Sequence, residues 1–150
     1  MDRPLRILIA EDDQGDALLI ERALKFSENG ASVTFVRDGR EAIDYLRGRP
    51  PFSDQVGIPA PTLLLLDLNL PKVSGFDVLR WVRKQPSLRR LNVVVFTSSE
   101  NPQDQQRALA LGADAYVVKP VTIDDFIESV LDMEKYWLRL NATPECEFVH

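Results

Sequence analysis

The sequence predicts a doubly wound α/β domain, in which helices cover both faces of a five-stranded parallel sheet. Five short apolar segments alternate with segments of helical periodicity along the 150 residues. Three of the apolar segments, among them Thr62–Leu66, are apolar at successive positions, which is typical of strands buried on both faces. A strict alternation of strand and helix then requires right-handed crossovers and a layer of helices on each side.

The apolar segments are the predicted strands. They cover Leu5–Ala10, Ser32–Val36, Thr62–Leu66, Asn92–Phe96 and Ala115–Val118. The predicted helices follow them, with starts and stops marked by glycine, proline and capping residues. They cover Asp16–Lys25, Arg40–Arg47, Phe76–Lys84, Pro102–Leu111 and Ile123–Leu140. We assign residues 1–140 to one domain and 141–150 to a tail, and interpret the proline-rich stretch 48–61 as a surface loop.

Composition excludes several classes of function. A net charge of -5 disfavours binding to nucleic acid or to an anionic membrane surface. One cysteine, Cys146, allows no internal disulfide, and His150 is the one histidine, so histidine-based catalytic triads are excluded. The sequence has no apolar segment of signal-peptide or transmembrane length. These features predict a soluble, cytoplasmic protein.

Charged and hydroxyl side chains follow four of the predicted strands. These groups are Glu11-Asp12-Asp13, Asp67, Thr97-Ser98-Ser99 and Lys119-Pro120. Because the carboxyl ends of parallel strands meet at one edge, we expect these side chains to converge on one crevice. Clustered carboxylates repel one another unless a hard cation such as Mg²⁺ neutralises them. A carboxylate beside bound Mg²⁺ can attack phosphorus and form an aspartyl phosphate, which indicates a phosphoacceptor role for Asp67.

The four motifs "ILIAEDD", "LLLLDLNLP", "VVVFTSS" and "AYVVKP" together resemble the receiver domain of two-component response regulators. The resemblance covers roughly residues 5 to 138 and implies a flavodoxin-like (βα)5 fold with strand order 2-1-3-4-5. It also implies that Asp67 accepts a phosphoryl group from the phosphohistidine of a histidine kinase. The protein would be a phosphoacceptor that assists its own phosphorylation and dephosphorylation, rather than a classical enzyme.

The resemblance also implies a role for each residue of the site. Glu11, Asp12 and Asp67 would hold Mg²⁺ together with the backbone carbonyl of Asn69. Thr97 and Lys119 would contact the phosphoryl group, and the Lys119-Pro120 peptide bond is expected to be cis, aiming the lysine inward.

Three further residues have expected roles in switching and in phosphate lifetime. Thr97 would move toward the phosphoryl group and Tyr116 would turn inward behind it, which changes the packed surface. Asn69 and Ser99 flank the route of the attacking water, so we predict that they tune the lifetime of the phosphoryl group. Ser98 is slightly bulkier than the very small residue usual in the family, which would alter phosphoryl access a little.

The output of the predicted switch must pass through protein contacts, because no output domain is expected after the last helix. Residues Phe126, Val130, Met133 and Trp137 form one apolar stripe on that helix, and Ile123, Ile127 and Leu131 form a second. We expect a homodimer through the first stripe. The proline-rich loop, "LDLNLPK" and "MEKYWL" are similar to small regulators that serve bacterial phytochrome-type histidine kinases, so such a kinase is the expected partner.

Two other classes share part of this pattern. Haloacid dehalogenase-type phosphatases use a strand-end aspartate with Mg²⁺, but they need a second aspartate two residues later as general acid, where this chain has Asn69. A flavodoxin-like flavin binder would share the fold, but Glu11-Asp12-Asp13 would repel a phosphate that has no metal. Neither a Walker loop nor a dinucleotide fingerprint occurs in the sequence.

Overall fold

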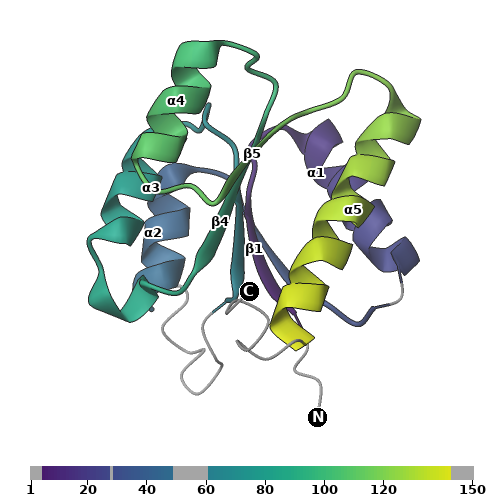
Figure 1. Ribbon diagram of the computed structural model, residues 1–150, viewed down its shortest axis with the longest axis horizontal. Helices are drawn as coiled ribbons and strands as arrows, with labels where there is room; N and C mark the ends of the chain where they lie inside the picture. Colours follow the sequence, from purple (N-terminus) through teal and green to yellow (C-terminus); the bar gives the residue numbers. More distant parts are fainter. Residues whose placement is uncertain (1–4, 28, 49–60, 143–150) are drawn as a thin grey trace, which may run out of the picture.

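The protein folds as one parallel sheet between two layers of helices (Figure 1). The computed structural model describes the main chain of residues 5–27, 29–48 and 61–142, with side chains through residue 139. The strand order is β2-β1-β3-β4-β5, and all four pairings are parallel. Helices α2, α3 and α4 cover one face, and α1 and α5 cover the other (Figure 1). The predicted fold class and strand order are confirmed.

The strands and helices occupy the segments that periodicity predicts, with small differences at their ends. The strands are β1 Arg6–Ala10, β2 Ser32–Val36, β3 Leu63–Leu66, β4 Asn92–Thr97 and β5 Ala115–Val118. The helices are α1 Gln14–Ser27, α2 Gly39–Arg47, α3 Gly75–Arg83, the 3-10 helix η2 Pro86–Leu88, α4 Pro102–Ala110 and α5 Ile123–Ala142. The prediction lacked η2, because its Pro86 was interpreted only as the stop signal of the preceding helix.

Successive residues of the inner strands point to opposite faces of the sheet and are buried on both. Leu64 and Leu66 pack in the core under α2, α3 and α4, whereas Leu63 and Leu65 pack in the core under α1 and α5. All four are buried. The continuous apolar runs therefore arise because each face of the sheet needs its own set of apolar side chains.

Polar side chains cap the first turns of the helices that start near the carboxyl edge of the sheet. Asp38 accepts a hydrogen bond from the amide of Glu41, and Ser74 accepts one from the amide of Asp77. Asp13 accepts one from the amide of Asp16 at 2.9 Å. This cap starts α1 at Gln14, two residues before the predicted start, because the free amides of the first turn gain an acceptor.

The predicted tail begins inside helix α5, which continues to Ala142. The predicted surface loop falls almost entirely on residues 49–60, and the remaining tail on 143–150; both lie outside the described residues. None of the helices within the described ranges combines the length and the apolar character that crossing a membrane needs.

The apolar stripe predicted for a homodimer packs inside the chain instead. Phe126, Val130 and Trp137 are only 3%, 2% and 6% exposed. They share a core with the sheet and α1, and the half-buried Met133 packs against that core. The choice of these four residues as a dimer face is therefore wrong, because α5 needs this stripe to cover its own sheet.

We predict that Trp137→Ala lowers the free energy of unfolding by about 3 kcal/mol, because it empties a buried site. The neighbouring Tyr136 is 53% exposed and contacts the Trp137 ring at 4.8 Å between centroids. Tyr136→Ala, the matched control, should cost about 1 kcal/mol or less. Denaturant unfolding of both variants measures the difference, and equal losses would contradict the packing described for α5.

Candidate functional site: a carboxylate cluster around a lysine

The ends of strands β1, β3, β4 and β5 meet at one edge of the sheet, as predicted. Ala10 pairs with Leu66 in the register of β1 and β3, and the amide of Asp67 donates to the carbonyl of Ala10 at 3.1 Å. The amide of Lys119 donates to the carbonyl of Thr97 at 2.7 Å. The residues that follow these strands are thereby fixed side by side.

Lys119 is the centre of this edge. Its side chain is 7% exposed, and its Nζ forms ion pairs with Glu11 Oε1 at 2.7 Å and Asp67 Oδ2 at 2.9 Å. It forms a third ion pair with Asp16 Oδ2, also at 2.7 Å. An ammonium group has three N–H donors, so three carboxylates satisfy it fully. The predicted grouping of Glu11, Asp67 and Lys119 is therefore present in the structure.

Asp16 is the residue that the sequence prediction missed. It lies in the first turn of α1, and its side chain reaches across to Lys119 after β5. An acidic residue in the first turn of a helix is ordinarily explained by the helix dipole, which favours negative charge there. That explanation hid its role, although its place one turn after the acidic cluster of residues 11–13 was a signal that could have indicated it.

Glu11, Asp12 and Asp67 form a group suited to a divalent cation. Each offers one carboxylate oxygen, and the three oxygens lie within 4.8 Å of one another. Glu11 and Asp67 are buried, whereas Asp12 is exposed. A set made only of carboxylate oxygens, open on one side, fits a hard cation such as Mg²⁺ that keeps some of its waters.

The surroundings shift the pKa values of Glu11 and Lys119 upward. Burial raises the pKa of Glu11 to about 7, and the charge of Asp67 adds to this, although the hydrogen bond from Lys119 opposes it. Burial alone would lower the pKa of Lys119, but its hydrogen bonds to Asp16, Glu11 and Asp67 outweigh burial and raise it above its usual value. The lysine is thus a permanent cation at neutral pH, whereas Glu11 is partly protonated there.

The connection after β3 holds Asp67 through its backbone. The amide of Asn69 donates to Asp67 Oδ1 at 3.2 Å, and the amide of Gly75 donates to the carbonyl of Leu68 at 3.0 Å. A Cβ atom at Gly75 would lie 2.2 Å from the carbonyl oxygen of Asp67. Only glycine lets α3 start this close to the acceptor, so residue 75 helps to fix where Asp67 lies.

The predicted switch residues are linked to one another by hydrogen bonds. Thr97 is fully buried, and its Oγ1 accepts a hydrogen bond from the amide of Ser99 at 3.4 Å. The Tyr116 hydroxyl donates to the carbonyl of Ser99 at 2.9 Å. The hydroxyl of Ser99 donates to Asp104 Oδ2 of α4 at 2.6 Å. Ser99 therefore connects β4, β5 and α4. The cis form of the Lys119-Pro120 peptide bond stays a prediction.

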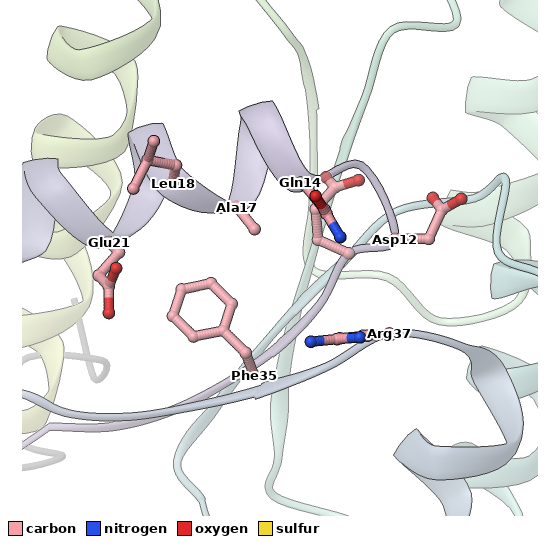
Figure 2. Close-up of a pocket in the computed structure, with 8 residues that line it drawn as sticks. Asp12, Gln14, Ala17, Leu18, Glu21, Phe35 and Arg37 are labelled. Atoms are coloured by element: carbon pink, nitrogen blue, oxygen red, sulfur yellow. The ribbon is translucent and has the colours of Figure 1, made fainter.

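A pocket of about 250 Å³ opens beside the carboxylates, between α1 and β2 (Figure 2). Ala17 and Leu18 of α1 lie on one side of it and the Phe35 ring of β2 on the other, with Arg37 nearer to Asp12 (Figure 2). The pocket shares Glu11 and Asp12 with the carboxylate group. The pocket thus borders the carboxylate group.

Comparison with known proteins gives the same family throughout. The family model of the response regulator receiver domain matches residues 7–131. The probable methanogenesis regulatory protein FilR2 of Methanothrix harundinacea is 36% identical over 141 residues, which cover 94% of this chain and 88% of that protein. The response regulator Rcp1 of Synechocystis sp. is 34% identical, with 94% of each chain covered.

Solved structures agree with these relatives. The phosphorylated cyanobacterial phytochrome response regulator RcpA superposes with a TM-score of 0.85 at 35% identity, covering 91% of this chain and 95% of its own. The Mn²⁺-bound form of Rcp1 has a TM-score of 0.85 at 34% identity, covering 94% of this chain and 99% of its own. The chain therefore belongs to the response regulator receiver domain family, with phytochrome response regulators among its homologues.

Proposed function

We propose that this protein receives a phosphoryl group on Asp67 from the phosphohistidine of a partner histidine kinase, and signals through a change of its surface. One observation carries the proposal, namely the surroundings of Asp67. Its carboxylate forms an ion pair with Lys119, which also pairs with Glu11, and it lies close enough to Glu11 and Asp12 for the three to bind one divalent cation. A nucleophilic carboxylate, a fixed cation and a set of metal ligands are the parts that phosphoryl transfer needs.

The transfer exchanges one bond for another. A carboxylate oxygen of Asp67 forms a bond to phosphorus while the P–N bond to the imidazole breaks, and the departing nitrogen takes a proton from water. Asp67 Oδ1 is held by the amide of Asn69, whereas Oδ2 is in contact with Lys119. The ammonium of Lys119 is thereby placed to pass from Oδ2 to an oxygen of the arriving phosphoryl group.

Glu11, Asp12 and Asp67, with the backbone carbonyl of Asn69, would hold Mg²⁺. When bound, this ion neutralises the carboxylates and spreads the negative charge of the transferring phosphoryl group. The Thr97 hydroxyl would meet another phosphoryl oxygen. Two observations support this site: the oxygen-only ligand set of this chain, and the Mn²⁺-bound form of its homologue Rcp1.

The kinase we propose is of the bacteriophytochrome type. The support is that Rcp1 and RcpA match nearly the whole chain, and that RcpA is a phytochrome response regulator. Transfer from a purified, phosphorylated kinase of this type should occur within seconds to minutes. Transfer that is no faster than from an unrelated histidine kinase would argue for another partner.

The hydrogen bonds of Ser99 give the switch its route to the surface. Movement of Thr97 toward the phosphoryl group would pull on the amide of Ser99, which the Tyr116 hydroxyl and Asp104 also hold. The connection between β4 and α4 would then change its packing. Thr97 and Tyr116 are thus the proposed switch residues.

We predict that incubation with Mg²⁺ and a small phosphodonor such as phosphoramidate places one acid-stable, base-labile phosphoryl group on the protein. Asp67→Asn should abolish it, because an amide is not a nucleophile toward phosphorus. Asp77→Asn, at an exposed aspartate of α3, is the control and should keep it. Peptide mass spectrometry locates the group, and an adduct that persists in Asp67→Asn would refute the acceptor assignment.

The same adduct, timed after removal of the phosphodonor, tests Asn69 and Ser99. Asn69 is exposed beside Asp67, so Asn69→Ala should change the decay rate by roughly threefold, which corresponds to about 0.7 kcal/mol in the barrier. Ser99→Ala frees Asp104 and shifts the connection that Ser99 holds, so a similar change is expected. Unchanged decay in both variants would remove them from this role.

We predict that Mg²⁺ binds more tightly as the pH rises. Because the pKa of Glu11 is raised to about 7, Mg²⁺ must displace a proton from it below that pH. The dissociation constant should fall about tenfold from pH 6 to pH 8, and Glu11→Gln should bind more weakly but without this dependence. Calorimetry in two buffers of different ionisation enthalpy counts the released proton; an equal pH dependence in Glu11→Gln would contradict the assignment.

A homodimer through α5 remains a proposal, and it would need residues other than the buried stripe. Ile123 and Tyr136 are 61% and 53% exposed on α5. Ile123→Asp with Tyr136→Ser should therefore return a dimer to a monomer in light scattering. A mass unchanged by this double substitution would remove α5 from the interface.

A further inference from the structure

The carboxylate of Asp16 contacts the phosphoacceptor site at Lys119. Its Oδ2 lies 2.7 Å from Lys119 Nζ, as short as the contact of Glu11 and shorter than the 2.9 Å contact of Asp67. The group of carboxylates suited to a divalent cation contains Glu11, Asp12 and Asp67 but not Asp16. Its backbone lies in α1, so it approaches Lys119 from a helix rather than from a strand end.

The three partners of Lys119 differ in what the proposed reaction does to them. Phosphorylation turns one oxygen of Asp67 into a bridging oxygen without charge. A bound divalent cation would pair with the Glu11 carboxylate and so weaken its ion pair with Lys119. Asp16 takes part in neither event. Its ion pair with Lys119 is therefore the one that can persist through the whole cycle.

We propose that Asp16 is a positioning residue, which holds the Lys119 ammonium at the acceptor site while Glu11 and Asp67 bind the cation and the phosphoryl group. This inference rests on the proposed function of Asp67. It adds that Lys119 has a constant partner outside the metal group. When a cation binds Glu11 and Asp67, the ammonium of Lys119 can keep its ion pair with Asp16.

The proposal fixes the direction of each effect on cation binding. Lys119 and Mg²⁺ compete for Glu11 and Asp67, so Lys119→Ala should tighten Mg²⁺ binding. In Asp16→Asn the ammonium loses its constant partner and stays on Glu11 and Asp67, so Mg²⁺ should bind about fivefold more weakly. When Lys119 is already absent, Asp16→Asn should weaken Mg²⁺ binding clearly less than it does when Lys119 is present, because only the loss of charge then remains.

This double-mutant cycle separates positioning from plain charge. Removal of a negative charge weakens cation binding whether or not a lysine is present, whereas positioning acts only through Lys119. Glu21→Gln is the charge-matched control, because it removes one negative charge from the same helix at a side chain that pairs with Lys25. It should leave Mg²⁺ affinity within about twofold of the unmodified protein. Asp16→Glu keeps the charge and should restore part of the loss.

The experiment measures Mg²⁺ affinity by calorimetry for the four proteins of the cycle, and the rate of phosphorylation by phosphoramidate for Asp16→Asn and Asp16→Glu. Asp16→Asn should slow phosphorylation about fivefold to tenfold, with Asp16→Glu between it and the unmodified protein. A loss of Mg²⁺ affinity that is equal with and without Lys119 would overturn the proposal, as would no loss at all.

The two proposals fail in different ways. If the unmodified protein takes no phosphoryl group on Asp67, the proposed function fails, whatever the cycle shows. If it is phosphorylated normally and Asp16→Asn matches it in both Mg²⁺ affinity and rate, only the positioning role fails. Circular dichroism should show that Asp16→Asn is folded, because the Asp16 side chain is 29% exposed.

Discussion

The site depends on the imbalance of charge around Lys119. One ammonium faces Glu11, Asp16 and Asp67, with Asp12 beside them, so one positive charge meets four carboxylates. Two carboxylates 4.8 Å apart repel each other by roughly 3 kcal/mol at an effective dielectric constant of 20. A single lysine cannot remove this repulsion for the whole set. Two responses remain: Glu11 binds a proton, which its raised pKa reflects, or a divalent cation takes the proton's place. The charges of the site thus favour a divalent cation, which would in turn reduce the repulsion that an anionic phosphoryl group meets there in the proposed function.

The parallel sheet makes this concentration of charge possible. Glu11, Asp67 and Lys119 directly follow the last residues of β1, β3 and β5, so the apolar interior of the sheet stays free of charge while its carboxyl edge collects it. Close backbone contacts then set the fine positions. The start of α3 presses against the carbonyl of Asp67, where any side chain at residue 75 would clash. The position of Asp67 is therefore set by the packing of its backbone as well as by its ion pair with Lys119.

The parts of the structure that follow from local patterns could be predicted, and the parts that depend on distant partners could not. The strands, their order and the grouping of Glu11, Asp67 and Lys119 follow from periodicity, strand-end chemistry and the family resemblance. Asp16 was missed because its partner lies 103 residues away, and because the helix dipole already explained an acidic residue in the first turn of α1. The buried stripe of α5 was assigned to the wrong surface for a similar reason. Both stripes of that helix are apolar, and the placement of α1 and the sheet decides which side chains become fully buried. The first stripe supplies Phe126, Val130 and Trp137, whereas Ile127 and Leu131 of the second are only partly buried.

In the proposed function, Lys119 belongs to the chemistry of the site and Ser99 to its output. Lys119 links α1, β1 and β3 through its ion pairs with three carboxylates. Ser99 links β4, β5 and α4 through hydrogen bonds of its amide, carbonyl and hydroxyl. The two sets touch where the amide of Lys119 donates to the carbonyl of Thr97. A phosphoryl group on Asp67 would act on both, because it would attract the ammonium from one side and the Thr97 hydroxyl from the other. The amide, carbonyl and hydroxyl of Ser99 are all hydrogen-bonded, so in the proposed switch a movement of Thr97 would either break one of these bonds or move Tyr116 and α4. Either result would alter the surface that a partner meets.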